Sequence, residues 1–328
     1  MPPLYIVLAF ALDAALGDPR RIPHPVRAIG WAVSVLEGLL IRPGAGRIRN
    51  RLAGTLLVII VVSSVFIITY LLIESVRLAF GGWACAALSV LLGYTTLAAR
   101  GLADAGRDVL TPLEAGDLGA ARKALSMVVG RDTGGLDEAD VARGAVETVS
   151  ENASDGVVAP LLYLAMGGAP LALAYKAVNT MDSMVGYRNE RYMDFGWAAA
   201  RLDDLANFIP ARLTALLMVA ASFVLPVLGL GRYSAVDSWR VLVRDRRNHT
   251  SPNSGYPEAA AAGALRVRLG GTNSYFGVPS AKPFMGDPDE PLGPGKIRDA
   301  VRLMYTASVL ALGVSVGIAY CVSAFDVY

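Results

Sequence analysis

The chain has 328 residues, of which 54% are hydrophobic and 18% are charged, and its mean hydropathy is +0.46. A soluble domain carries about 25% charged residues, so this composition excludes an ordinary soluble protein and indicates an integral membrane protein. The net charge of +2 excludes a global basic field of the kind that attracts nucleic acid. The two Cys and two His residues predict neither a disulfide framework nor a zinc site.

The apolar segments, taken in chain order, predict an all-α, polytopic membrane protein with about five to six membrane segments. We expect these segments to form a single integral membrane domain over residues 1–328. The first apolar run, 4–16, is short and contains Asp13. The clearest spans are 52–73 and 79–99, which carry no charge, and further spans are predicted at 213–230 and 304–324.

The uncharged segment 157–174 is interrupted by Gly167, Gly168 and Pro170. This interruption predicts a broken or re-entrant helix, which is tolerated at membrane depth where it lines a cavity. If the segment is re-entrant, the polar clusters on its two sides meet. If every apolar segment crosses once, residues 179–212 lie on the side opposite to the other polar loops. We expect the clusters to converge, and the sequence leaves the number of crossings open.

The polar loops indicate an orientation. Residues 20–51 contain seven Arg and one Glu, an excess of positive charge that is typical of the cytoplasmic side. The two larger polar loops, 101–156 and 231–303, are expected to contribute to a functional site. In the Arg-rich N-terminal loop, His24 lies between two prolines. It is either an ordinary loop histidine or a contact to a phosphate or carboxylate.

The densest polar chemistry lies between residues 147 and 192. Glu147, Glu151 and Asp155 are spaced at i, i+4 and i+8, which places them on one face of a continuous helix. Lys176 and Asn179 follow the interrupted segment, again close to one helical face. These groups form a solvated helix face, pair with one another, or bind a ligand, because polar groups at a membrane boundary are costly when they stay unpaired.

Common nucleotide and hydrolase motifs are absent from the sequence. It has no Walker A loop, no glycine fingerprint for a dinucleotide and no GxSxG elbow. Carboxylates beside Asn and Ser suit Mg²⁺, and nearby Lys and Arg suit phosphate charge. The residues alone therefore fit a polar site for Mg²⁺ and phosphate in a membrane protein, and a transporter of an anionic solute equally well.

Four groups of motifs resemble one known family. They are D-x3-GDP with HPV-x2-IG between residues 13 and 30, ETVSENASDGVVAPL over 147–161, YKAVNTMDSMVGYRNERY with FGWAAARLDD between 175 and 204, and NSGYPEAAAAGAL with LGGTNSYFG between 253 and 277. In this order they resemble the CbiB/CobD family of cobalamin-biosynthesis membrane proteins, the adenosylcobinamide-phosphate synthases.

The resemblance implies an ATP-dependent ligase of the cell membrane with its active site facing the cytoplasm. The implied reaction joins adenosylcobyric acid, a corrinoid, to (R)-1-amino-2-propanol O-2-phosphate and yields adenosylcobinamide phosphate in cobalamin biosynthesis. ATP is the implied cosubstrate, with Mg²⁺. The implied partners are the two substrates, the lipid bilayer and other enzymes of the pathway, and no nucleic acid.

On the matching motifs, we assign provisional roles to individual residues. Glu147, Glu151 and Asp155 are expected to serve as metal ligands or base, and Lys176 to stabilise phosphate charge. The expected substrate contacts are His24, Asn152, Asn179, Asp182, Arg188, Arg191, Asn253, Ser254 and Asn273.

Two alternatives to the ligase remain from the sequence. One is a membrane transporter of a corrinoid or another anionic solute. The other is a non-catalytic membrane sensor related to AmpE-type regulators. A sensor does not need the carboxylates at 147, 151 and 155, all of which are present, and this favours the enzyme.

Overall fold

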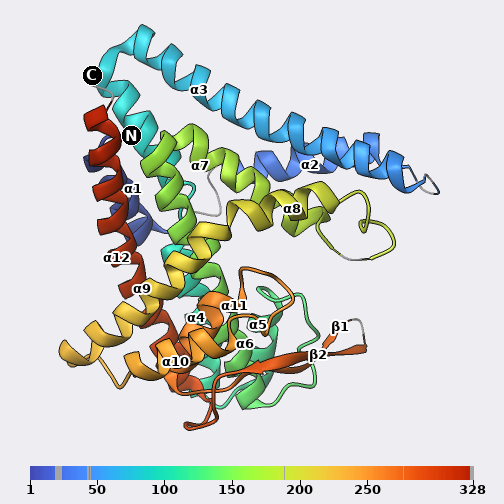
Figure 1. Ribbon diagram of the computed structural model, residues 1–328, viewed down its shortest axis with the longest axis vertical. Helices are drawn as coiled ribbons and strands as arrows, with labels where there is room; N and C mark the ends of the chain where they lie inside the picture. Colours follow the sequence, from blue (N-terminus) through green and yellow to red (C-terminus); the bar gives the residue numbers. More distant parts are fainter. Residues whose placement is uncertain (19–23, 43, 45, 188, 276, 326–328) are drawn as a thin grey trace. The chain divides into compact units, whose positions relative to one another are not determined.

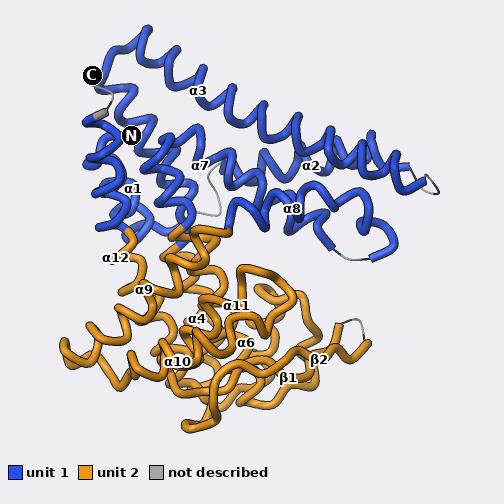
Figure 2. The backbone as a smooth tube through the Cα atoms, viewed as in Figure 1, with its two compact units in different colours: residues 1–98, 159–207, 312–328 blue, residues 99–158, 208–311 orange. Residues whose placement is uncertain are grey.

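The computed structural model describes residues 1–18, 24–42, 44, 46–187, 189–275 and 277–325. Its backbone contacts divide the chain into two compact units (Figure 2). Unit 1 comprises residues 1–98, 159–207 and 312–328, and unit 2 comprises residues 99–158 and 208–311. The single-domain prediction stays a prediction, whereas both polar loops that we expected to form a site, 101–156 and 231–303, belong to unit 2.

The described residues are mostly helical, as predicted (Figure 1). The helices of unit 1 are α1 (Pro3–Leu16), α2 (Pro25–Leu40), α3 (Arg47–Tyr94), α7 (Ala159–Val185) and α8 (Trp197–Ala206). The elements of unit 2 are α4 (Ala99–Glu114), α5 (Leu118–Ser126), α6 (Glu138–Ala153), the π-helical turn η1 (Ser154–Val158), α9 (Phe208–Val227), α10 (Ala235–Asp245), α11 (Gly255–Leu265), β1 (Leu269–Tyr275) and β2 (Val278–Met285). The chain closes with α12 (Pro294–Phe325), which contributes residues to both units.

Two long helices of unit 1 break at a glycine. In α3 the break lies at Gly81 (φ 81°, ψ −175°), and in α7 it lies at Gly168 (φ 66°, ψ −161°). This backbone region is accessible almost only to glycine. Figure 1 shows that both helices change direction along their length. The broken helix predicted for 157–174 is confirmed, and the two spans predicted at 52–73 and 79–99 are parts of one broken helical segment.

Among the described residues, four helical stretches are long and apolar enough to cross a membrane, namely 47–114, 138–185, 208–227 and 294–324, and α1 is a shorter apolar helix. The glycine breaks divide the first two of these stretches into separate helical pieces. The prediction of a polytopic helical membrane protein is therefore confirmed for the described chain.

The core of unit 1 lies among α2, α3, α7 and α8. Leu57, Met181 and Phe195 are fully buried there. Gly54 of α3 lies directly against the Phe195 backbone. A Cβ atom at residue 54 would stand 1.7 Å from the Phe195 carbonyl oxygen. This close approach lets the backbone at Phe195 pack onto α3.

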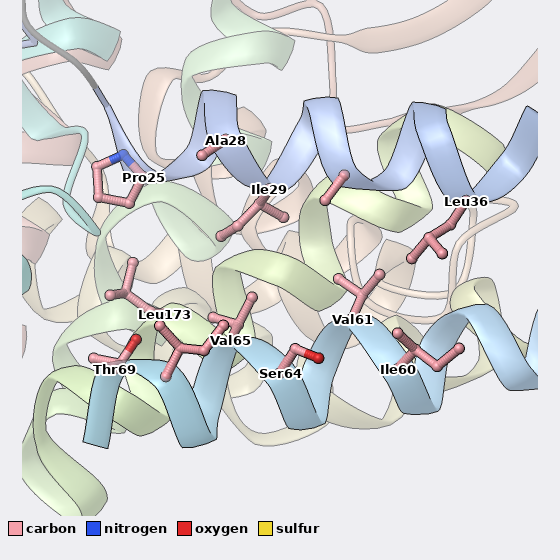
Figure 3. Close-up of a pocket in the computed structure, with 12 residues that line it drawn as sticks. Pro25, Ala28, Ile29, Leu36, Ile60, Val61, Ser64, Val65, Thr69 and Leu173 are labelled. Atoms are coloured by element: carbon pink, nitrogen blue, oxygen red, sulfur yellow. The ribbon is translucent and has the colours of Figure 1, made fainter. Parts of the chain in front are cut away.

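An apolar cavity of about 300 Å³ opens between α2 and α3 in unit 1 (Figure 3). Its walls come from the two helices and from Leu173 of α7, and the hydroxyl groups of Ser64 and Thr69 are the polar side-chain groups in this lining. None of the described residues that line it is titratable, so this cavity offers no group for acid–base or phosphate chemistry. A second pocket of unit 1, of about 390 Å³, is lined by Ile41, Arg42, Gly44, Asn50, Glu190 and Arg191.

Unit 2 is built around α11, a helix of small residues that is buried along nearly its whole length. Small side chains allow close contact with α9, α10 and α6, and Gly263 packs against the backbone of Asp237. The following residues form an antiparallel hairpin, β1–β2, with an irregularity between Leu269 and Gly271. Its glycines supply positive φ angles at the irregularity and beside the turn, while residues 272–275 are extended.

Candidate functional site

A polar pocket of about 160 Å³ lies in unit 2. Its walls come from the loop after α5, one face of α6, α11 and the β1–β2 hairpin. The lining residues are Val128, Val129, Gly130, Arg131, Glu147, Thr148, Glu151, Asn152, Glu258, Tyr275 and Lys282. Three carboxyl groups and two cations therefore converge in one small space.

Helix α6 positions the first two carboxylates. It begins after Asp137, whose side chain accepts a hydrogen bond from the Asp140 amide and caps the helix. From this start, Glu147 and Glu151 lie one turn apart on the same face. Both side chains line the pocket, and their role in a functional site stays a prediction.

Glu147 is a buried, fully paired carboxylate. It accepts a hydrogen bond from Arg131 Nη2 at 2.6 Å and another from the Gly270 amide at 2.9 Å. The side chains of Arg131 and Glu147 are only 5% and 10% exposed. Arg131 also donates to Asn273 Oδ1 at 2.5 Å. These hydrogen bonds connect the loop after α5 to α6 and β1. The contacts of Glu147, Arg131 and Asn273 therefore stabilise the fold.

Glu151 has fewer hydrogen-bond donors around it than Glu147. It is partly exposed, and its Oε1 accepts a hydrogen bond from Ser254 Oγ at 2.7 Å. Ser254 directly precedes α11, so the structure brings these two predicted site residues together. The neighbouring Asn253 is buried, and its Oδ1 accepts a hydrogen bond from Arg212 Nη1 at 3.2 Å.

A third carboxyl group, Glu258, is 3% exposed and lines the same pocket. His249 is one of its partners, with Nε2 3.6 Å from Glu258 Oε1. Burial, followed by the nearby negative charges of Glu151 and Glu147, raises the pKa of Glu258 well above its ordinary value. The side chain is therefore held in its protonated form more strongly than a surface glutamate.

His249 is a neutral neighbour of this carboxyl group. Burial, and then the charge of Lys282, lower the pKa of His249. Its Nδ1 accepts a hydrogen bond from the Ser251 amide at 3.0 Å. A neutral imidazole that accepts at Nδ1 carries its proton on Nε2, so the proton faces Glu258.

Lys282 supplies a cation on β2. Its Nζ lies 3.4 Å from His249 Nε2. In the tautomer assigned above this nitrogen carries a hydrogen, so it cannot accept a hydrogen bond from Lys282. Within the described chain, no carboxylate lies within 4 Å of this nitrogen, since none of the ion pairs of unit 2 includes it. Lys282 is half-buried at the pocket wall, which leaves a partly desolvated cation directed at the pocket.

Asp155 does not continue the row of Glu147 and Glu151. The α-helical part of α6 ends at Ala153, and Ser154–Val158 form a π turn. A π turn is wider than an α turn, so the i+8 spacing no longer returns to the same face. No group of three or more His, Cys, Asp or Glu side chains in the described residues lies close enough to hold a metal ion. The expected three-carboxylate ligand set therefore does not fit the structure, although a metal brought by a substrate is a separate matter.

Other predicted site residues lie in unit 1, around Asp203. Asp203 accepts hydrogen bonds from Asn179 at 3.4 Å and from Asn207 at 3.0 Å. Burial raises the pKa of Asp203, and the cation of Lys176 acts in the opposite direction. The same Lys176 contributes to a lowered pKa of His24, for which burial is the main cause. Lys176, Asn179 and His24 thus belong to one polar neighbourhood of unit 1.

The remaining predictions have mixed outcomes. Arg191 donates to Glu37 Oε1 at 2.7 Å, which gives it a partner within unit 1. Asn152 lines the pocket of unit 2 and donates to the Thr148 carbonyl at 2.9 Å. Asp182 lies in α7, where its carbonyl accepts from the Gly186 amide. Arg188 lies outside the described residues.

Three charged or ionisable residues of the pocket, Arg131, Glu258 and Lys282, were not among the predicted site residues, and neither was His249, which contacts Glu258 and Lys282. Glu258 stands within the NSGYPEAAAAGAL motif, and its charge in an otherwise apolar helix is a signal that sequence reasoning could have used. Lys282 has no such signal, because it lies in a stretch of ordinary loop composition. Only the pairing of Gly271 with Lys282 in the hairpin brings it to the pocket.

Together, these features define a polytopic helical membrane protein with a small polar pocket in unit 2, which is lined by both carboxyl groups and cations. The sequence profile of the family described as CobD/Cbib protein matches residues 6–304. The chain therefore belongs to the CobD/CbiB family.

Several curated relatives carry closely similar sequences over nearly their whole length. The "Cobalamin biosynthesis protein CobD" of Geobacter metallireducens is 55% identical over 305 residues, which cover 93% of each chain. The protein of the same name from Pelobacter propionicus is 50% identical over 95% of this chain and 93% of its own. The "Cobalamin biosynthesis protein CbiB" of Salmonella typhimurium is 44% identical over 93% of both chains. No solved structure matches the chain.

Proposed function

We propose that this protein acts in cobalamin biosynthesis as an ATP-dependent ligase, an adenosylcobinamide-phosphate synthase. It would join adenosylcobyric acid to (R)-1-amino-2-propanol O-2-phosphate through an amide bond. Family membership supports the pathway, since the relatives are named for cobalamin biosynthesis. The observation that carries the assignment to an enzyme is the polar pocket of unit 2, where Glu151, Glu258 and Lys282 line one small space.

The proposed chemistry has two steps. A carboxylate oxygen of adenosylcobyric acid attacks the γ-phosphorus of ATP, and ADP leaves. The amine nitrogen of the second substrate then attacks the acyl carbon, the C–N bond forms, and inorganic phosphate leaves. An amine is protonated at neutral pH and must lose its proton before it attacks, and Glu151 is our candidate for the group that accepts this proton.

The remaining roles concern phosphate. Lys176 is our candidate for stabilising the negative charge of the transferred phosphoryl group. Mg²⁺ enters this proposal as the ion that accompanies ATP, for which one or two carboxylates and the substrate phosphates suffice. Neither role requires the three-carboxylate set expected from the sequence.

We further propose that the polar loops of unit 2 face the cytoplasm in a multi-pass cell-membrane protein. The excess of Arg in residues 20–51 supports this orientation. A cysteine introduced at the exposed Ser126 of α5 tests it. In a background without the two native cysteines, an impermeant thiol reagent should label this site in inverted vesicles and leave it unlabelled in right-side-out vesicles.

The test of the activity is product formation by mass spectrometry. Purified protein is mixed with adenosylcobyric acid, aminopropanol phosphate, ATP and Mg²⁺, in parallel with a Glu151→Gln variant. The matched control is Glu138→Gln, which changes an exposed carboxylate on the same helix. We expect product from the wild type and the control, and a loss of at least about 100-fold from Glu151→Gln, as for removal of a general base.

The other outcomes discriminate among functions. Equal product from all three proteins would keep the ligase and remove Glu151 from its chemistry. No ATP-dependent product from folded wild-type protein with verified substrates would reject the ligase and favour a transporter or a sensor.

A further inference from the structure

The pocket of unit 2 is small. Pockets that take drug-sized ligands occupy about 300–1,000 Å³, and this one has a volume of about 160 Å³. A nucleoside triphosphate and a corrin ring both exceed that space. The pocket instead has room for a molecule of a few heavy atoms.

The pocket contains both positively and negatively charged side chains, and internal ion pairs do not neutralise all of them. Arg131 and Glu147 neutralise each other in a buried ion pair. Lys282 retains its positive charge without a carboxylate within 4 Å in the described chain. Glu151 is held by the hydroxyl group of Ser254 rather than by a cation. The space therefore contains one negative and one positive group that a ligand can pair.

Glu258 adds an independent sign of a ligand. Its side chain is 3% exposed and lines the pocket, and the ion-pair partner that the described residues give it is a neutral histidine at 3.6 Å. A buried carboxyl group in such surroundings lacks the partners that usually compensate its desolvation. An incoming hydrogen-bond donor or cation would supply them.

We propose that this pocket binds the small amine substrate as a zwitterion, with its ammonium group at Glu151 and Glu258 and its phosphate group at Lys282. This inference rests on the proposed function for the identity of the molecule, an amino-alcohol phosphate. The pocket matches that class in size and in the sign of charge at both ends. A triphosphate matches neither, because its negative charges would face two carboxyl groups.

The consequence is a division of labour between binding regions. The amine is held in unit 2 beside Glu151, the group proposed to accept its proton. ATP binds outside this pocket. The phosphate of the amino alcohol then acts as a handle that positions the nitrogen, since binding energy remote from the reacting atom can be used for orientation.

Binding measurements on the purified full-length protein in detergent test this inference. The probes are (R)-1-amino-2-propanol O-2-phosphate, the same amino alcohol without phosphate, and ATP, each titrated calorimetrically. Lys282→Gln should weaken binding of the phosphorylated probe by about tenfold or more, the value of a charge-assisted hydrogen bond. It should leave the affinities for ATP and for the unphosphorylated probe unchanged.

Three variants keep the test interpretable. Lys123→Gln changes an exposed lysine of unit 2 outside the pocket and should bind all probes like the wild type. Lys282→Arg retains the charge and should retain most of the affinity. Glu258→Gln should weaken binding of both amine probes, because it removes a partner of the ammonium group. A common melting temperature for the variants shows that lost binding is not lost folding.

The outcomes separate this inference from the proposed function. Wild-type affinity of Lys282→Gln for the phosphorylated probe would overturn the inference, even in an active ligase. Loss of ATP binding in Lys282→Gln, with amine binding intact, would make the pocket a nucleotide site and also overturn it. Specific binding of the phosphorylated probe with no ligation of it would support the pocket assignment and reject the ligase.

Discussion

The two compact units treat their polar side chains differently. In unit 1, buried or half-buried charged groups find partners within the fold: Asp203 accepts from two asparagines, and Glu37 accepts from Arg191 and Tyr192. In unit 2, the ion pairs of the described residues give Lys282 of the pocket no carboxylate within 4 Å, and they give Glu258 only His249.

Two of the cavities show the same contrast. The one between α2 and α3 in unit 1 is lined mainly by hydrocarbon, and the one beside α6 and α11 in unit 2 is lined by carboxyl groups and cations. Polar groups that are satisfied internally stabilise a fold, whereas polar groups that lack partners in a pocket await a ligand. The comparison favours the pocket of unit 2 as a ligand site, and the following predictions are ways to break or sharpen it.

The largest effect is expected from Arg131→Met in unit 2. This change leaves Glu147 as a buried carboxylate without its cation, and it should lower the free energy of unfolding by roughly 3–5 kcal/mol. Thermal unfolding in detergent measures the loss. The double variant Arg131→Met/Glu147→Gln should recover part of it, because the uncompensated charge is gone.

The control for this prediction is Arg298→Gln. Arg298 forms an exposed ion pair with Glu114 in the same unit, and its removal should cost less than about 1 kcal/mol. An equal decrease in the free energy of unfolding for Arg131→Met and Arg298→Gln would show that the buried ion pair stabilises the fold no more than the exposed one.

The next effect concerns backbone packing in unit 1. Gly54→Ala would place a Cβ atom 1.7 Å from the Phe195 carbonyl oxygen. Backbone must move to relieve this clash, and a loss of about 1–3 kcal/mol or more is expected. Gly38→Ala in α2 is the matched control, since nothing lies within 4 Å of its Cβ position. It should be neutral or stabilise the helix by about 0.5–1 kcal/mol. Comparable melting temperatures for the two variants would argue against the close contact.

A smaller, pH-dependent effect is expected from Glu258→Gln. The pKa of Glu258 in the folded protein is raised above its ordinary value of 4.5, mainly by burial. The folded state therefore retains a proton that the unfolded state loses, and this group makes the protein less stable as the pH rises above about 4.5.

The melting temperature of Glu258→Gln should accordingly exceed that of the wild type at pH 8, and the difference should shrink towards pH 5. The wild type and the variant are compared across this range without ligand. A difference that grows as the pH falls would have the wrong sign and would show that Glu258 is ionised in the folded protein.

The smallest effect is expected from Arg191→Gln in unit 1. Arg191 was a candidate substrate contact, but it is largely exposed and pairs with Glu37. Exposed ion pairs contribute about 0–1 kcal/mol. We expect a slight loss of stability and unchanged binding of the three probes used above. A clear loss of probe affinity would return Arg191 to the site and would weaken the contrast between the two units.

Part of the site could be predicted from local sequence. Glu147 and Glu151 share a pocket because helical periodicity alone brings residues i and i+4 together. The same reasoning failed for Asp155, because the turn after Ala153 is π-helical, and no pattern in the chain announces the change. Ser254 was predicted from a motif, but its hydrogen bond to Glu151 depends on how α11 packs beside α6.

The sequence by itself determined the class of this protein. Its hydropathy defines a polytopic membrane protein, its glycines and proline mark the break in α7, and its motifs indicate the family, because these properties are carried by neighbouring residues. Tertiary structure decided which charges are paired and which are left for a ligand. Arg131, Glu147, Glu258 and Lys282 are distant in sequence, and only the packing of α6, α11 and the β1–β2 hairpin brings them to one pocket. Burial then sets the charge state of Glu258, since the cost of desolvation depends on the surroundings of a group and not on its neighbours in the chain.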